Sequence, residues 1–111
     1  MRQRSAFLSA GLLLAGACLS SSALAADVAA GRQKAAACAV CHGPMGVATA
    51  PDAPNLAGQP ELYLTAQLRA YRGGTRQHEV MNLMAKPLSD ADIEDLAAWF
   101  SSLKIQAQPA P

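Results

Sequence analysis

The pentapeptide Cys38-Ala39-Val40-Cys41-His42 constrains the fold of this chain more than any other feature. A C-x-x-C-H sequence is typical of c-type haem attachment. Two thiols three positions apart on a helical turn can each bond to one of the two vinyl groups on a haem edge, and the adjacent histidine can then bind the iron. The motif predicts one covalently bound haem, with the rest of the chain folded around it.

Three other kinds of site use a Cys-x-x-Cys pair, and the sequence disfavours each of them. Zinc needs four ligands, and the chain has no second pair of this kind. A dithiol redox motif lies beside a βαβ pattern, whereas no strand-like alternation appears here. A simple disulfide in an oxidising compartment explains the two cysteines but not the histidine that follows Cys41.

The first 25 residues have the pattern of a secretory signal peptide. Two arginines precede an apolar run over residues 6–19, and residues 23–25 match the A-x-A cleavage pattern. We expect cleavage after Ala25 and export to the periplasm, since bacteria attach haem to protein outside the cytoplasm. Cys18 allows a second interpretation, a lipoprotein signal that leaves a membrane tether. That signal has an aliphatic residue three positions before its Cys, where this chain has Ala15, so we favour the A-x-A site.

The expected mature chain is small and nearly neutral. Removing Arg2 and Arg4 reduces the nine basic residues to seven, against eight acidic ones, so the formal net charge becomes −1. This balance gives no reason to expect nucleic acid or an acidic membrane surface as a partner. A chain of this size with few aromatic residues is marginal for an ordinary core, and a buried macrocycle would supply the missing apolar bulk.

Three helices are readable. The first runs from about Val28 into the haem motif, and the second opens at residues 59–61 and ends before residues 73–74. The third begins after Ser89, whose N-cap role is reinforced by Asp92 as the acid of a capping box. Its apolar stripe is formed by Ile93, Leu96, Ala97, Phe100 and Leu103.

The predicted fold is all-α, with one domain over residues 26–105. Two long loops, residues 42–59 and 72–88, separate the helices, and loops of that length in a compact domain usually wrap around something, here the haem. Residues 106–111 are expected to form a disordered tail.

The sixth ligand of the iron has several candidates at this stage. Met81 and Met84 lie in the second loop, and a His/Met pair raises the reduction potential of haem iron. Methionine is also a common filler of irregular apolar gaps. His78 competes as a ligand, although an exposed loop histidine is the commoner case. An open sixth position is the remaining option.

Several further motifs follow the same order as in a known family. The shared pieces are Gly31, Cys38-x-x-Cys41-His42-Gly43, Pro54-Asn55-Leu56-Ala57-Gly58-Gln59, Tyr63-Leu64-x-x-Gln67-Leu68 and Met81-x-x-Met84-x-x-Pro87-Leu88-Ser89-Asp90. With these motifs the chain resembles a class I cytochrome c of bacteria, closest to one half of the tandem dihaem cytochromes and to small monohaem relatives. The resemblance implies the class I cytochrome c fold, with three main helices and two long loops around one haem c.

The resemblance also implies a role for individual residues. Cys38 and Cys41 match the thioether anchors, His42 the proximal ligand and Met81 the distal ligand. The carbonyl of Pro54 matches the group that accepts the ring N–H of the proximal histidine, a bond that fixes the tautomer and orients the ring.

Two further correspondences concern packing around the site. Met84 matches a residue that packs near the haem edge. Gly31 matches the contact between the first and last helices, opposite Trp99 and Phe100. The chain has only one such unit, so the haem-to-haem transfer of the tandem family is not expected.

The expected function is one-electron transport in the periplasm, not enzymatic turnover, because an iron with two protein ligands has no vacancy for substrate. Expected partners are redox proteins, such as a cytochrome-reducing complex, a dehydrogenase or a terminal oxidase or reductase, met in small contacts. We expect no nucleic acid, no membrane span, and a monomer or weak dimer. The alternatives are an electron-transfer subunit or lipid-tethered cytochrome of a larger oxidoreductase and, less favoured, a haem sensor with a displaceable distal ligand.

Overall fold

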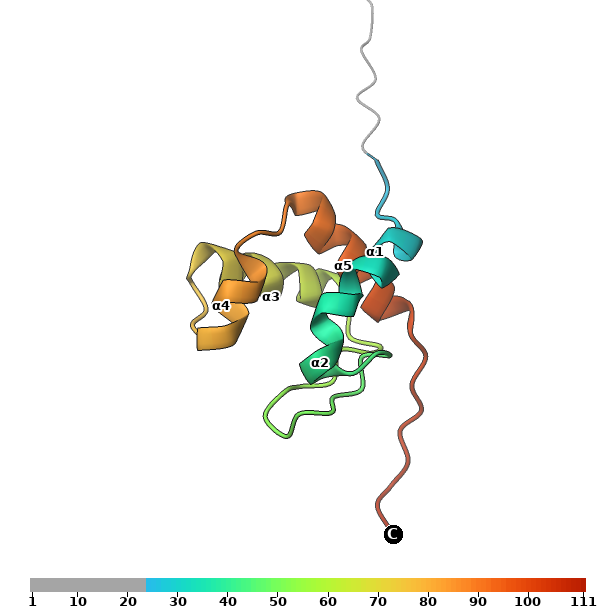
Figure 1. The fold of residues 1–111 in the computed structure, drawn as a ribbon. Helices are drawn as coiled ribbons and strands as arrows, with labels where there is room; N and C mark the ends of the chain where they lie inside the picture. Colours follow the sequence, from blue (N-terminus) through green and yellow to red (C-terminus); the bar gives the residue numbers. More distant parts are fainter. Residues whose placement is uncertain (1–23) are drawn as a thin grey trace, which may run out of the picture.

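The computed structural model describes residues 24–111, so most of the expected signal peptide, with Cys18, lies outside the described residues. Every regular element of the described part is helical, which confirms the all-α prediction (Figure 1). The elements are α1 (Val28–Lys34), the 3₁₀ helix η1 (Ala35–Cys38), α2 (Ala39–His42), α3 (Glu61–Gly73), α4 (Glu79–Ala85) and α5 (Asp90–Ser102). None of these helices combines the length and the apolar character needed to span a bilayer.

The helices α1 and α5 cross at Gly31 (Figure 1). A Cβ atom added at Gly31 would lie 1.9 Å from the backbone oxygen of Asp95 and 2.9 Å from Cβ of Trp99. Both distances are far below van der Waals contact, so only glycine permits this approach of the two backbones. The expected contact of Gly31 with Trp99 is present, and the backbone of Asp95 is closer still.

One apolar core lies where η1, α3 and α5 meet. Its buried residues come from these three elements: Ala35, Leu64, Leu96, Ala97, Trp99 and Phe100. The predicted stripe of α5 is confirmed, since four of its five residues are buried and Leu103 is partly buried. Cys38 packs against this cluster, which places the haem motif at the edge of the core.

The helix ends follow the local sequence, with one difference from prediction. The capping box of α5 is confirmed, because Ser89 Oγ accepts from Asp92 N and the Asp92 carboxylate accepts from Ser89 N. The first helix reaches the haem motif as expected, but η1 interrupts it with tighter 3₁₀ winding, which is common at helix ends and connections. The second helix begins at Glu61, with Pro60 as its N-cap.

The expectation of a continuous loop over residues 72–88 is wrong, because α4 forms inside it. Gly74 ends α3 with φ +81°, a left-handed conformation that glycine adopts without strain. The chain then restarts a helix at His78, whose ring Nδ1 accepts from Met81 N at 3.3 Å. A seven-residue helix is too short to give a readable period, and tertiary contacts decide whether it forms.

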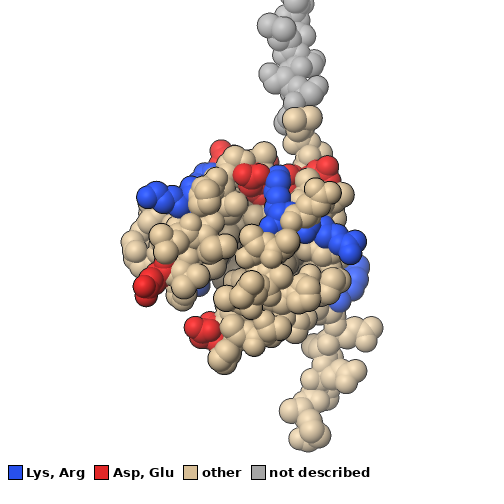
Figure 2. All heavy atoms as spheres, viewed as in Figure 1, with Lys and Arg blue, Asp and Glu red and all other residues tan. Residues whose placement is uncertain are grey.

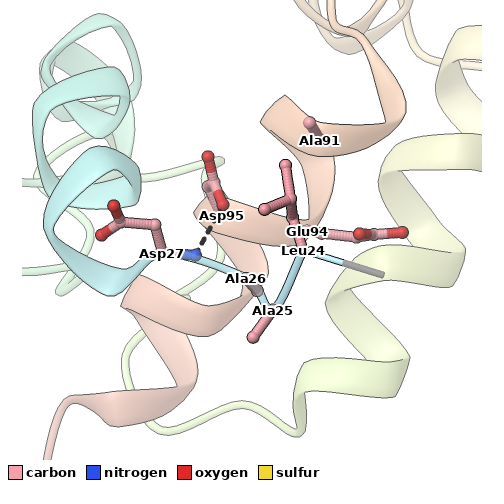
Figure 3. A pocket seen from close by; sticks show the side chains of 7 residues that line it. All are labelled: Leu24, Ala25, Ala26, Asp27, Ala91, Glu94 and Asp95. Carbon is pink, nitrogen blue, oxygen red and sulfur yellow. Dashed lines mark hydrogen bonds between the residues drawn. The ribbon is translucent and has the colours of Figure 1, made fainter. Parts of the chain in front are cut away.

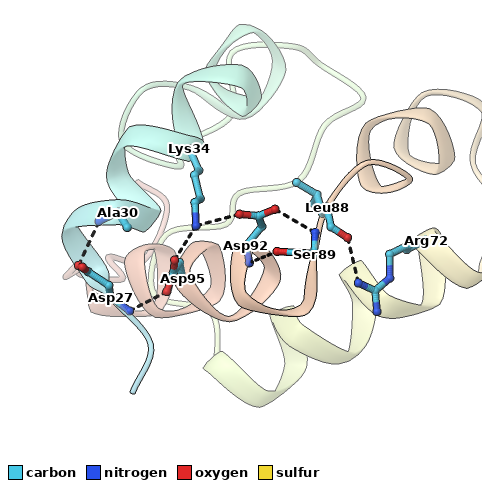
Figure 4. A network of polar contacts seen from close by, with 8 residues as sticks. All are labelled: Asp27, Ala30, Lys34, Arg72, Leu88, Ser89, Asp92 and Asp95. Carbon is cyan, nitrogen blue, oxygen red and sulfur yellow. Dashed lines mark hydrogen bonds and ion pairs between the residues drawn. The ribbon is translucent and has the colours of Figure 1, made fainter. Parts of the chain in front are cut away.

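Ion pairs join the helices at one end of the molecule (Figure 4). Lys34 of α1 lies 2.9 Å from Asp92 and 2.6 Å from Asp95, both on α5. These pairs lower the pKa of both carboxyls, that of Asp92 to about 2, and raise the pKa of Lys34. Arg72 of α3 binds Asp90 at 2.6 Å and the carbonyl of Leu88 at 2.9 Å, so α5 is tied to α3 as well.

The start of the described chain lies against α5 (Figure 3). The backbone N–H of Asp27 donates to Asp95 Oδ1 at 2.7 Å, and the carboxylate of Asp27 caps α1 by accepting from Ala29 N and Ala30 N. A shallow pocket here is lined by Leu24, Ala25, Ala26, Asp27, Ala91, Glu94 and Asp95. Asp95 therefore anchors both Lys34 and the segment that precedes α1.

Candidate haem-attachment site

The attachment residues lie on η1 and α2. Cys38 is the last residue of η1, while Cys41 and His42 end the single turn of α2. Both cysteines are partly buried free thiols, so they form no disulfide in this structure. Burial raises the pKa of the Cys38 thiol. Across residues 24–111 no three His, Cys, Asp or Glu side chains gather in a group that could hold a metal ion.

His42 is buried and held in one orientation. Its side chain is 8 % exposed, and its Nδ1 lies 2.8 Å from the carbonyl oxygen of Pro54, the contact that the resemblance implies. A carbonyl only accepts hydrogen bonds, so Nδ1 must carry the proton and Nε2 keeps its lone pair. An oriented imidazole with a free Nε2 beside two thiols is a donor set that fits a covalently attached haem iron.

The loop between α2 and α3 is what brings Pro54 to His42. The N–H groups of Thr49 and Ala50 donate to the carbonyl of Cys41, so the loop folds back on the haem motif. A second pair of bonds, from Leu56 N and Ala57 N, converges on the carbonyl of Gly46 at 2.7 and 3.0 Å. The loop is therefore closed by its own backbone on both sides of Pro54.

Asn55 is a site residue to which sequence reasoning assigned no role. Its Oδ1 accepts from the backbone N–H of Ala48 at 2.7 Å, across the loop and directly beside Pro54. Asn55 belongs to the Pro-Asn-Leu-Ala-Gly-Gln motif, but its bond partner is seven residues away and no local pattern points to it. We infer that it stiffens the segment that presents the Pro54 carbonyl.

The residues expected on the distal side lie on or beside α4. Met81 is partly buried in its first turn, whereas Met84 is 40 % exposed. His78, the competing ligand, is the N-cap of α4 and its ring lies edge-on to Tyr71 at 6.5 Å between centroids. Its Nδ1 is occupied by the N–H of Met81, so its role in this structure is that of a helix cap.

Comparison with known proteins agrees with this geometry. The family model described as Cytochrome c matches residues 28–104, which is most of the chain. The chain belongs to the cytochrome c family. It is an electron-transfer domain of the cytochrome c4 kind, and its cofactor is a covalently bound haem c.

Two curated relatives resemble this chain, one over nearly its whole length and the other over part of its length. The chain is 47 % identical over 81 residues to "Cytochrome c-554(548)" of Halomonas halodenitrificans, a match that covers 70 % of this chain and 98 % of the relative. It is also 47 % identical over 87 residues to "Thiosulfate dehydrogenase electron acceptor" of Thiomonas intermedia, covering 78 % of this chain but only 40 % of that protein. The cytochrome spans less than half of the second relative.

The solved structures give the same result for the fold. The crystal structure of reduced recombinant cytochrome c4 from Pseudomonas stutzeri superposes with a TM-score of 0.68 at 45 % identity. The match covers 72 % of this chain and 47 % of that chain. This cytochrome therefore corresponds to about one half of the cytochrome c4 structure, as the order of its motifs indicates.

The surface of this cytochrome is uneven in charge (Figure 2). Charged side chains gather where α1, α3 and α5 meet, and the part around α2 shows mainly uncharged side chains in this view. Val40 beside the haem motif is 84 % exposed, and Met45 and Val47 in the following loop are about half exposed. The apolar exposed residues thus lie next to the attachment cysteines.

Proposed function

We propose that this cytochrome is a periplasmic one-electron carrier with its haem c bonded to Cys38 and Cys41 and ligated by His42 and Met81. Haem iron with two protein ligands alternates between ferric and ferrous states and has no vacant position for a substrate. The single observation that carries the proposal is the buried His42, whose Nδ1 is engaged by Pro54 and whose Nε2 is left free. The chain is a carrier in this account, without turnover of its own.

Each residue has a defined task in the proposed site. The two thiols bond the cofactor to the end of η1 and to the end of α2. The Pro54 carbonyl keeps the proton of His42 on Nδ1 and increases the basicity of the ligating nitrogen. Met81 supplies a thioether, a soft and weakly held ligand that favours the ferrous state.

Substitution of the two methionines tests the ligand set directly. Met81→Ala should abolish the long-wavelength sulfur-to-iron absorption band of the oxidised protein and lower its reduction potential. Met84→Ala is the matched control and should leave the band in place, because it changes the same residue type one turn away on α4. The opposite pattern would assign the ligand to Met84. Rapid binding of carbon monoxide by the reduced wild-type protein would favour the haem sensor instead.

A second candidate is an electron-accepting subunit of a larger oxidoreductase. The Thiomonas relative, named as an electron acceptor of thiosulfate dehydrogenase, motivates it. The mass of the protein purified from its host separates the two candidates. A chain that starts at Ala26, carries one haem and migrates alone supports the free periplasmic carrier. A lipid on Cys18, or a stable complex with a dehydrogenase, supports the tethered or subunit form.

A further inference from the structure

The helix α4, which carries Met81, has little apolar packing of its own. Only Ala85 is buried among its seven residues, whereas Val80, Leu83 and Met84 are 50, 69 and 40 % exposed. A helix of this length does not persist in water without tertiary contacts. Polar contacts with α3 therefore carry much of the protein's own hold on its first turn.

The side chain of Asn82 makes that connection with three hydrogen bonds. Its Oδ1 accepts from the backbone N–H of His78 at 2.6 Å. Its Nδ2 donates to the carbonyl oxygens of Tyr71 at 2.7 Å and Arg76 at 2.8 Å. Since both carbonyls only accept, the amide nitrogen must face them, and all three bonds agree with one amide orientation. One side chain therefore joins the last turn of α3, the connecting segment and the N-cap of α4.

The other contacts of this segment are weaker or lie outside α4. The cap bond from Met81 N to His78 Nδ1 is long, at 3.3 Å. The guanidinium of Arg76 lies over the Tyr71 ring at 4.6 Å and donates to Gln67, so it ties the connection to α3 alone. Asn82 is thus the residue whose side chain reaches from α4 to both the connection and α3.

We propose that Asn82 is a positioning residue for the axial ligand Met81, its neighbour in the chain. The inference rests on the proposed function, in which Met81 binds the iron. By fixing the first turn of α4 to the end of α3, Asn82 restricts where the Met81 backbone can move. Without it, α4 separates more often from α3 and the thioether leaves the iron more often.

This proposal predicts a change in a measurable equilibrium. Imidazole binds ferric haem only in the open state, so its apparent dissociation constant equals the intrinsic constant divided by the open fraction. Loss of the three bonds in Asn82→Ala should raise the open fraction and lower the apparent dissociation constant about tenfold, the size expected for roughly one net hydrogen bond. Asn82→Asp keeps the acceptor for the His78 N–H but sets a carboxylate oxygen against the two carbonyl oxygens, so it should lower the apparent dissociation constant at least as far as alanine does.

Imidazole titration of the oxidised holoprotein, followed through the sulfur-to-iron band, is the test. Gln77→Ala is the matched control, because Gln77 lies in the same connection but donates only to Gly74, not to α4. Its imidazole affinity should equal that of wild type. Urea unfolding of the same variants separates positioning from general stability. If Asn82 acts by positioning Met81, its loss should change the free energy of imidazole binding more than the free energy of unfolding. If oxidised Asn82→Ala lacks the band before imidazole is added, the open state already dominates, which supports the proposal with a larger effect than expected.

Two results would overturn it: unchanged imidazole affinity in both Asn82 variants, or an equal gain in Gln77→Ala. Failure of the proposed ligand set looks different, since the band would then survive in Met81→Ala. If Asn82→Ala does not accumulate as holoprotein, the Asn82→Asp titration decides alone.

Discussion

The crossing of α1 with α5 and the connection of α3 with α4 are held together by different means. At the crossing, backbone meets backbone at Gly31, and the buried core lies directly beside it. At the connection, exposed and partly buried residues are joined by hydrogen bonds from the side-chain amide of Asn82. The first arrangement is cooperative with the whole fold, whereas the second can open locally, as weakly packed elements do. We therefore expect the side of the proposed ligand His42 to stay fixed and the side of Met81 to open first.

The largest expected effect comes from Gly31→Val. The new side chain meets the backbone of Asp95, which cannot move aside, so α1 and α5 must separate. We expect a loss above about 4 kcal/mol in the free energy of unfolding, or no folded holoprotein. Gly73→Ala is the control, since a Cβ there meets nothing within 4 Å. Denaturant unfolding measures both, and a Gly31 variant as stable as the Gly73 variant contradicts the crossing.

A pair of leucines compares the core with α4. Leu64 is 6 % exposed and packs in the core, so Leu64→Ala should cost about 2–4 kcal/mol of unfolding free energy. Leu83 on α4 is 69 % exposed, and its replacement by alanine should change stability by less than about 0.5 kcal/mol. Thermal unfolding of the holoprotein tests the difference. An equal loss at both positions would show that α4 belongs to the same cooperative unit as the core.

The smallest effect concerns pH and the ion pairs of Lys34. The pKa of Asp92 is lowered to about 2 and that of Asp95 is lowered as well, mainly by hydrogen bonds from Lys34. Carboxyls with depressed pKa values stabilise the fold above their unfolded pKa of about 4. That stability is lost as pH falls through about 2. The pKa of Lys34 is raised, so its own contribution is complete below about 10.5 and is lost as pH rises further.

Replacing Lys34 by methionine tests this dependence. Urea unfolding between pH 5 and pH 2 should show a shallower fall in stability for Lys34→Met than for wild type, because the carboxyls regain ordinary pKa values. Lys86→Met is the control, since Lys86 forms no ion pair among the described residues. If stability falls in parallel in all three proteins, these exposed pairs contribute nothing measurable to the free energy of unfolding, which is common for surface pairs.

Predictions from the sequence were right where the interacting residues are close together in the chain. The capping box at Ser89, the glycine end of α3 and the apolar stripe of α5 were all readable, because each depends on spacings of one or two turns. The helix α4 was not readable. Its amide anchor Asn82 reaches back 11 residues to Tyr71, and nothing in a seven-residue segment reports on that contact.

The sequence by itself determined the covalent cofactor and the helical class, and it predicted the anchors of the haem, since five adjacent residues contain the chemistry of attachment. Tertiary structure decided how these residues are oriented. The Pro54 carbonyl reaches His42 because the loop closes on Cys41 and Gly46, and the Asn82 side chain connects the helix that carries Met81 to α3. The residue types determine which chemistry is possible. Their orientation depends on contacts between segments that are far apart in the sequence.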